Sequence, residues 1–326
     1  MLARSRDLRI GSQVVGRTPL LCPSFSSKGF PDIRKILNLM SEFITESVLV
    51  SAYDIHYRKI SQKKVSFPGL ILLDCGGYET RLDHDLSEAY GREHKPRAWS
   101  RKHYVAVMKQ WRVRTATVAV SFDSPKNFLG VRRQISEARR LQGELPRIPV
   151  TLLIKPDTKK NTFVSMSSAI QHVNDLRSFF AVGFTEKEID HSLLGRMTKI
   201  AQLRRAMDSA KVDIPIHIFG SLDTMSTPLY FISGAEIFDG LTWLRFGYHE
   251  GYTMYAQNYG AIREPDGLLH KPNDKVFQMW KNNYYYLLKL KDQMINYVRT
   301  DDFSAFPYVG PRLEEAYTQL EARLTT

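Results

Sequence analysis

Three aspartates lie directly after short apolar runs that have the length and composition of buried β-strands. They are Asp74, Asp123 and Asp239. Where strands and helices alternate, the carboxyl ends of the strands meet at one face, and barrel enzymes keep their catalytic side chains there. A carboxylate in that position can transfer a proton, or it can attack a sugar carbon with oxocarbenium character. Taken singly, each aspartate is explained as well by a turn or a helix cap.

The elements that would position these acids alternate between strand and helix. Eight strands are predicted, at Leu20–Ser24, Val48–Tyr53, Leu70–Asp74, Ala116–Phe122, Val150–Ile154, Phe179–Val182, Ile216–Phe219 and Ile237–Leu241. Helices are predicted between most of them, at Asp32–Thr45, Trp99–Val113, Phe128–Gln142, Ser165–Arg177, Glu188–Ser209 and Met225–Gly234. This alternation predicts an α/β fold with a parallel sheet, closed as a (β/α)₈ TIM barrel. A doubly wound open sheet is the alternative, although no G-x-G-x-x-G follows the first strand.

The barrel pattern ends near residue 260, which predicts two parts. Residues 1–260 would form the barrel, and residues 261–326 a C-terminal helical extension packed on it. The stretch Gly247–Asn273 is rich in turn residues and leads to a long helix, Asp274–Arg299. A last short helix is predicted near Leu313–Leu324.

The segment Ile214–Gly251 carries the most specific pattern. It reads as a strand, a helix opened by Asp223, and a second strand that ends in an acid followed by glycine. It resembles the tRNA-guanine transglycosylases, the archaeal branch most of all, in an H-x-F-G strand and an F-D strand. The matching residues are His217, Phe219, Gly220, Phe238 and Asp239. The resemblance implies that Asp239 is a catalytic nucleophile that attacks C1′ of a nucleoside and expels guanine.

A second motif, LILLDCGGYET, resembles the D-S-G-G-F-Q of the same family. Cys75 replaces the serine and Glu79 replaces the glutamine. The resemblance implies that Asp74 is the catalytic general acid/base. Gly76 and Gly77 would leave room for a planar base, and Tyr78 or another aromatic residue would stack on it.

Three further matches complete the predicted base pocket. Asp123 corresponds to the family aspartate that binds the two adjacent donors on the pyrimidine edge of guanine. Val182 and Gly183 resemble a strand end at which backbone groups meet the base, and Gly220 closes the pocket. Phe184 replaces the second glycine of that strand end, so the pocket wall should differ from the family's. Three strand-end acids in the family's order favour an active site over three unrelated turns.

The composition limits the classes of protein. The chain has 326 residues, a net charge of +12 and two cysteines, Cys22 and Cys75. Two cysteines cannot form the Cys₃His zinc site of the tRNA enzymes, so neither a structural metal nor a cofactor is expected. The sequence contains no apolar run of membrane-spanning length and no signal-peptide pattern, so a cytoplasmic protein without a membrane partner is expected.

The positive charge favours a nucleic-acid partner, held around the mouth of the barrel. Basic residues that follow predicted strand ends are the candidates: Arg58, Lys59, Lys63, Lys64, Arg97, Arg101, Lys102 and Arg245. The plainer interpretation is a solvated basic surface. The sequence leaves open whether a second copy of the chain or a partner protein is required.

Neither the zinc site nor the C-terminal RNA-binding modules of the tRNA enzymes is expected, because the cysteines are too few and 326 residues leave no room for the modules. The chain is therefore more similar to the branch that replaces guanine in DNA with a 7-deazaguanine base, such as 7-cyano-7-deazaguanine. Two alternatives remain, the same exchange on tRNA and a non-catalytic nucleic-acid-binding paralogue. Retention of all three acids argues against the second.

Overall fold

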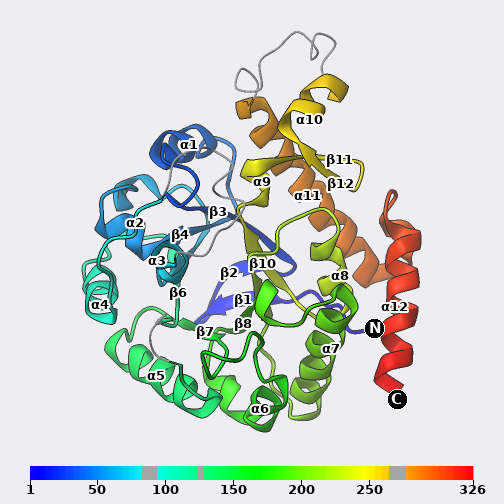
Figure 1. Cartoon of the computed structure of the whole chain (residues 1–326), viewed down its shortest axis with the longest axis horizontal. Coiled ribbons are helices and arrows are strands. Elements are labelled where there is room, and N and C mark those ends of the chain that lie inside the picture. The colour runs from blue at the N-terminus through cyan, green and yellow to red at the C-terminus, as the bar shows by residue number, and fades with distance from the viewer. Residues whose placement is uncertain (82–93, 124–127, 264–275, 326) are drawn as a thin grey trace.

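The fold is a (β/α)₈ TIM barrel that is followed along the chain by C-terminal helices (Figure 1). The structure is a computed structural model that describes residues 1–81, 94–123, 128–263 and 276–325. The barrel strands are β3 (Leu20–Phe25), β4 (Ser47–Ser51), β5 (Leu70–Asp74), β6 (Ala116–Val120), β7 (Val150–Ile154), β8 (Ala181–Thr185), β9 (Ile216–Phe219) and β10 (Ile237–Gly240). All neighbours pair in parallel, and β10 pairs with β3 to close the barrel. All eight predicted strands are confirmed, and the open sheet is excluded.

Helices surround the barrel and bury its outer face. They are α1 (Ile33–Met40), α2 (Ala52–His56), α3 (Gly77–Thr80), α4 (Arg101–Lys109), α5 (Val131–Glu144), α6 (Met166–Gln171), α7 (Leu193–Ser209), α8 (Ser226–Ile232) and α9 (Thr242–Arg245). Short 3₁₀ turns cover Gln62–Lys64, Val173–Ser178, Glu186–Glu188 and Phe303–Ala305. The predicted helix Ser165–Arg177 is therefore α6 followed by a 3₁₀ turn.

The inside of the barrel is filled by alternate side chains of its strands, as the pleat requires. Leu20, Leu72, Val118 and Ile237 belong to this inner cluster. The same alternation turns Asp74, two residues beyond Leu72, and Asp239, two residues beyond Ile237, to the inside of the barrel at the carboxyl ends of β5 and β10. The strand pattern thus places both acids at one mouth.

Two β-hairpins lie outside the barrel, and the sequence prediction missed both. Strands β1 (Asp7–Ile10) and β2 (Gln13–Arg17) close the amino end of the barrel, where Leu8 joins the inner cluster. Strands β11 (Phe246–His249) and β12 (Tyr252–Tyr255) form the second hairpin, and α10 (Ala256–Arg263) follows. The prediction of a turn-rich stretch from Gly247 was therefore wrong for this part. The hairpin turn has positive φ at Glu250 and Gly251, as a tight two-residue turn requires.

The C-terminal helices pack against the barrel. Helix α11 (Val276–Thr300) is fixed by the buried Asn283, whose amide donates to the carbonyl oxygens of Trp243 and Phe246. Helix α12 (Gly310–Thr325) packs against α7 and α8 (Figure 1). Among the described residues, none of the helices is both long and apolar enough to cross a membrane.

Candidate active site

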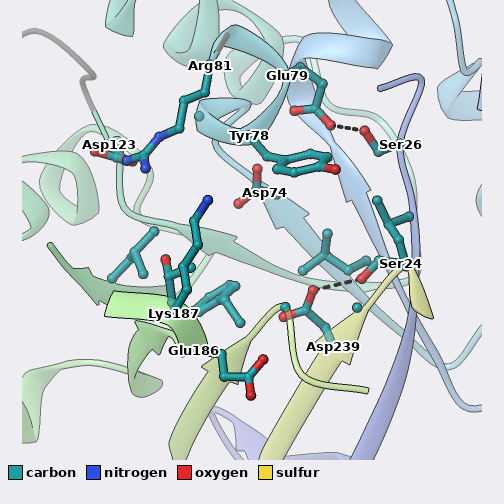
Figure 2. Close-up of a pocket in the computed structure, with 18 of the residues that line it drawn as sticks. Ser24, Ser26, Asp74, Tyr78, Glu79, Arg81, Asp123, Glu186, Lys187 and Asp239 are labelled. Atoms are coloured by element: carbon teal, nitrogen blue, oxygen red, sulfur yellow. Dashed lines mark hydrogen bonds and ion pairs between the residues drawn. The ribbon is translucent and has the colours of Figure 1, made fainter. Parts of the chain in front are cut away.

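A cavity of about 370 Å³ opens at the carboxyl ends of the barrel strands. Six acids line it, Asp74, Glu79, Asp123, Glu186, Asp223 and Asp239. Four basic residues share its wall, Arg81, Lys155, Lys187 and Arg245. Figure 2 shows Asp74, Asp239 and Lys187 pointing into this space from different elements. The fold thus brings the two predicted catalytic acids and the predicted base-binding acid to one cavity.

Asp239 is held from two sides. It is 5% exposed, and its Oδ2 accepts a hydrogen bond of 2.7 Å from Ser24 Oγ of β3 (Figure 2). Its Oδ1 lies 2.9 Å from Nε2 of His217 on the neighbouring strand β9. Pairing of β10 with both β3 and β9 places these partners beside the acid. The carboxylate is therefore fixed in orientation at the edge of the cavity.

Asp74 is in an environment that favours its protonated form. Burial raises the pKa of Asp74 to about 7, and the charges of Glu79 and Asp239 add to the rise. The Gly76 N–H donates to Asp74 Oδ2 at 2.9 Å and lowers the pKa in part. A carboxyl group that titrates near neutrality can donate a proton and take it back, as a general acid/base must.

A second buried acid, Glu79, lies close enough to Asp74 for its charge to raise the Asp74 pKa. Glu79 is 2% exposed, and Ser26 and Ser51 donate hydrogen bonds to its two oxygens. Burial raises the pKa of Glu79 to about 7, and the charge of Asp54 contributes. Glu79 thus adds a second buried ionisable group whose charge acts on Asp74.

The segment Ser24–Ser27, at the carboxyl end of β3, supplies a hydroxyl group to each of three buried acids. Ser24 donates to Asp239 and Ser26 donates to Glu79. Ser27 donates to Asp54, which lies on α2. A single segment thus fixes three carboxyl groups that lie on α2, α3 and β10.

Asp123 is part of an ion network at the far wall of the cavity (Figure 2). Its Oδ2 lies 2.9 Å from Arg81 and 3.7 Å from Lys155. Both cations also pair with Glu188, at 3.1 and 2.5 Å. Two cations therefore hold one oxygen of the acid predicted to bind the base.

The predicted glycine and aromatic positions divide into two groups. Gly77, Tyr78 and Gly220 line the cavity. A Cβ at Gly77 would lie 3.1 Å from Asp123 Oδ2, so glycine permits this approach. Tyr78 is fixed by Arg245, which donates to its hydroxyl at 3.0 Å.

The other predicted pocket residues lie behind the wall. Gly76 has φ of +85°, and a Cβ there would meet Trp99 and Tyr53 at 2.8 Å. Val182 is fully buried in the outer core between the strands and the helices. Gly183 packs under Phe219, whose ring leaves no room for a Cβ at this position. These residues support the shape of the cavity and do not line it.

The predicted basic surface is not brought to one edge. Of the eight basic residues predicted to bind nucleic acid, only Arg245 lines the cavity. Arg97 lies over the Tyr57 ring, and Arg101 pairs with Glu144 at the end of α5. Arg58, Lys59 and Lys102 are exposed on the α2 and α4 side.

Lys63 and Lys64 lie in the turn Gln62–Lys64, and both are exposed. The Gln62 side chain accepts a hydrogen bond from the Arg112 backbone. Arg112 lines a second cavity together with Ala116, the first residue of β6. The two lysines are therefore near the amino end of the barrel, opposite the acids.

Sequence reasoning missed several residues of the site. Ser24, Arg81, Lys155 and Lys187 had no assigned role, although all four line the cavity. Lys155 directly follows β7, and Lys187 follows β8 by two residues, in the way that Asp123 follows β6. A search for any charged residue after a strand end, and not only for acids, would have found both lysines.

Comparison with known proteins adds no family assignment. No protein-family model matches the chain, and a search of curated proteins finds no match. Within the described residues, no group of three His, Cys, Asp or Glu side chains is arranged to hold a metal ion. The arrangement of the site therefore carries the functional argument.

Proposed function

We propose that the protein exchanges guanine in a nucleic acid, DNA in the first place, for a 7-deazaguanine base. Asp239 would be the nucleophile and Asp74 the general acid/base. The observation that carries this proposal is the meeting of the two acids in one cavity, with one held by Ser24 and His217 and the other titrating near neutrality.

In the first step, an Asp239 oxygen forms a bond to C1′ of the target nucleotide as the bond from C1′ to guanine N9 breaks. Asp74 gives its proton to the departing guanine, which leaves as a neutral base. In the second step, the ring nitrogen of the incoming base attacks C1′ and loses its proton to Asp74, and the bond from C1′ to Asp239 breaks. Both residues return to their starting states, as double displacement requires.

The remaining wall of the cavity is suited to a planar, polar base. Tyr78 offers a ring, and Gly77 and Gly220 leave space along the wall. Asp123 offers a carboxylate whose position is fixed by Arg81 and Lys155. A carboxylate matches the N1–H and 2-amino group of guanine, which a 7-deazaguanine shares. For duplex DNA, the target nucleotide would have to be flipped into the cavity.

The test is base exchange with labelled guanine, run in parallel on single-stranded DNA, duplex DNA and tRNA. We expect exchange of labelled guanine on DNA, and we expect lasting replacement of guanine in the DNA only when a 7-deazaguanine base is supplied. Asp239→Asn should lower the rate by at least about 10⁴-fold, as loss of a catalytic nucleophile does. Asp175→Asn, which changes an exposed acid paired with Arg139, is the matched control and should leave the rate unchanged. Exchange on tRNA alone would reassign the substrate, and binding without exchange on any of the three would indicate a non-catalytic paralogue.

A further inference from the structure

The two oxygens of Asp239 face different surroundings. Ser24, which hydrogen-bonds Oδ2, lines the cavity. His217, which hydrogen-bonds Oδ1, is 1% exposed and does not line it. The Oδ2 edge therefore borders the space that a substrate would occupy, and the Oδ1 edge is turned toward the barrel interior.

The imidazole of His217 is held in place by packing. It stacks on Phe219 with ring centroids 3.7 Å apart and an interplanar angle of 26°. The Phe219 ring also lies against Gly183, where a Cβ would lie 2.4 Å from Phe219 Cε2. Phe219, packed against both Gly183 and His217, thus restrains the plane of the imidazole, and a larger residue at position 183 would displace Phe219.

The hydrogen-bonding pattern fixes which ring nitrogen carries the hydrogen. Among the described residues, Nδ1 of His217 is buried without a hydrogen-bond partner, so the one polar link of the side chain is from Nε2 to Asp239. A carboxylate can only accept, so Nε2 must donate. The tautomer with hydrogen on Nε2 is set by Asp239 alone, as ring nitrogens are generally set by the bond that they make.

We infer that His217 is a positioning residue that holds Oδ1 of Asp239 away from the cavity, so that Oδ2 is the attacking atom. This inference rests on the proposed function of Asp239. When Oδ2 bonds to C1′, the double bond of the new ester lies at Oδ1, which still accepts from Nε2–H. When the C1′–Oδ2 bond breaks, its electron pair returns to the carboxylate, and the same hydrogen bond stabilises the returning charge. His217 gains and loses no proton in either step.

Two substitutions separate the hydrogen bond from the packing. His217→Phe keeps an aromatic ring for the stack on Phe219 and removes the donor. His217→Gln supplies an amide N–H at a reach similar to that of Nε2. We expect the Phe variant to lose about 10²-fold in kcat, because one preorganised donor to a developing charge is removed. The Gln variant should recover at least about tenfold of this loss. KM for the free base should change by less than about threefold in both, because the base does not touch His217.

His191→Phe is the matched control. This histidine lies against Phe163 at 4.2 Å between ring centroids, away from the cavity, and its replacement should leave kcat unchanged. Near-normal kcat in His217→Phe would overturn the inference, and so would a Gln variant no faster than the Phe variant while both melt at the wild-type temperature.

A measurement independent of turnover separates this inference from the proposed function. In protein labelled with ¹⁵N at histidine, the His217 signal should show hydrogen on Nε2, and Asp239→Ala should shift it strongly. Absence of exchange in the wild type together with this spectrum would reject the proposed function and keep the Asp239–His217 pair. Hydrogen on Nδ1, or a spectrum insensitive to Asp239→Ala, would reject the positioning role.

Discussion

At the scale of single residues, the buried carboxyl groups make the protein sensitive to pH. The folded-state pKa of Glu79, about 7, lies above its unfolded value of about 4.5, so the folded protein binds its proton more tightly. The free-energy cost of burying Glu79 is therefore small below pH 4.5, where its carboxyl group is protonated in the folded and the unfolded state. The cost grows as the pH rises to 7. At alkaline pH the cost is on the order of 3–4 kcal/mol, at about 1.4 kcal/mol per pKa unit.

Glu79→Gln should remove this cost and keep hydrogen bonds to Ser26 and Ser51. We expect the variant to melt several degrees above the wild type at pH 8.5 and at nearly the same temperature at pH 5. Loss of the Glu79 charge should also lower the pKa of Asp74, so the alkaline limb of the exchange rate should move to lower pH. Melting curves and rate profiles across this pH range check both, and a variant less stable than wild type at pH 8.5 would refute the account of Glu79.

The sequence indicated the acids of the site but not their partners. Asp74, Asp123 and Asp239 could be found because an apolar strand followed by an acid is a local pattern. Ser24, His217 and Arg81 become their neighbours only when β10 pairs with β3 and β9 and when Arg81, directly after α3, pairs with Asp123. Such contacts depend on ring closure and on loop paths, which no local spacing encodes.

At the scale of elements, α11 fixes the residues that follow β10. The buried Asn283 donates to the carbonyl oxygens of Trp243 and Phe246 and accepts from the Tyr248 N–H. Replacement by Ala would leave these three backbone groups buried without their partner. Because each such group costs about 1–3 kcal/mol, Asn283→Ala should destabilise the protein by at least about 3 kcal/mol. Since the residues that Asn283 fixes also place Arg245 in the cavity, the rate of base exchange should fall as well.

Urea unfolding monitored by circular dichroism measures this loss. Gln278→Ala on the same helix is the control, because among the described residues its side chain bonds to Asn282, one turn further on, and its loss should cost less than about 1 kcal/mol. Equal stability of the two variants would show that Asn283 does not anchor α11.

The sequence predicted the barrel strands well because each is a continuous apolar run bounded by polar residues, as strands buried on both faces are. It missed the hairpins β1–β2 and β11–β12 because their strands are partly exposed and contain no continuous apolar run. Which of their side chains are buried depends on packing against the amino end of the barrel and against α11. The order of apolar and polar residues in these strands does not show that packing.

At the scale of the whole molecule, the positive charge is spread over both ends of the barrel. Arg245 lines the cavity, whereas Lys63 and Lys64 lie near the amino end. Arg245→Glu should therefore lower the rate of base exchange by a larger factor than it lowers the affinity for DNA. Because Lys63 and Lys64 lie away from the cavity, the triple variant Lys59→Glu, Lys63→Glu and Lys64→Glu should weaken DNA binding no more than a charge-matched reversal elsewhere does, and a much larger loss would contradict this placement.

Fluorescence anisotropy of DNA binding between about 50 and 200 mM salt measures both effects. Reversal of Arg299, Arg312 and Arg323 on the C-terminal helices is the charge-matched control. If both triple variants weaken binding equally, the surface acts only through net charge. If the first binds DNA as the wild type does, Lys59, Lys63 and Lys64 make no phosphate contacts.

The most direct test of the account is identification of the covalent intermediate. The protein is mixed with guanine-containing DNA without an acceptor base, denatured and digested, and the peptide that carries the nucleotide is sequenced by mass spectrometry. The account predicts one adduct, an ester between Asp239 and C1′ of a nucleotide that has lost guanine, which Asp239→Asn does not form. An adduct on any other residue, or none on DNA or tRNA under conditions in which exchange proceeds, would contradict it.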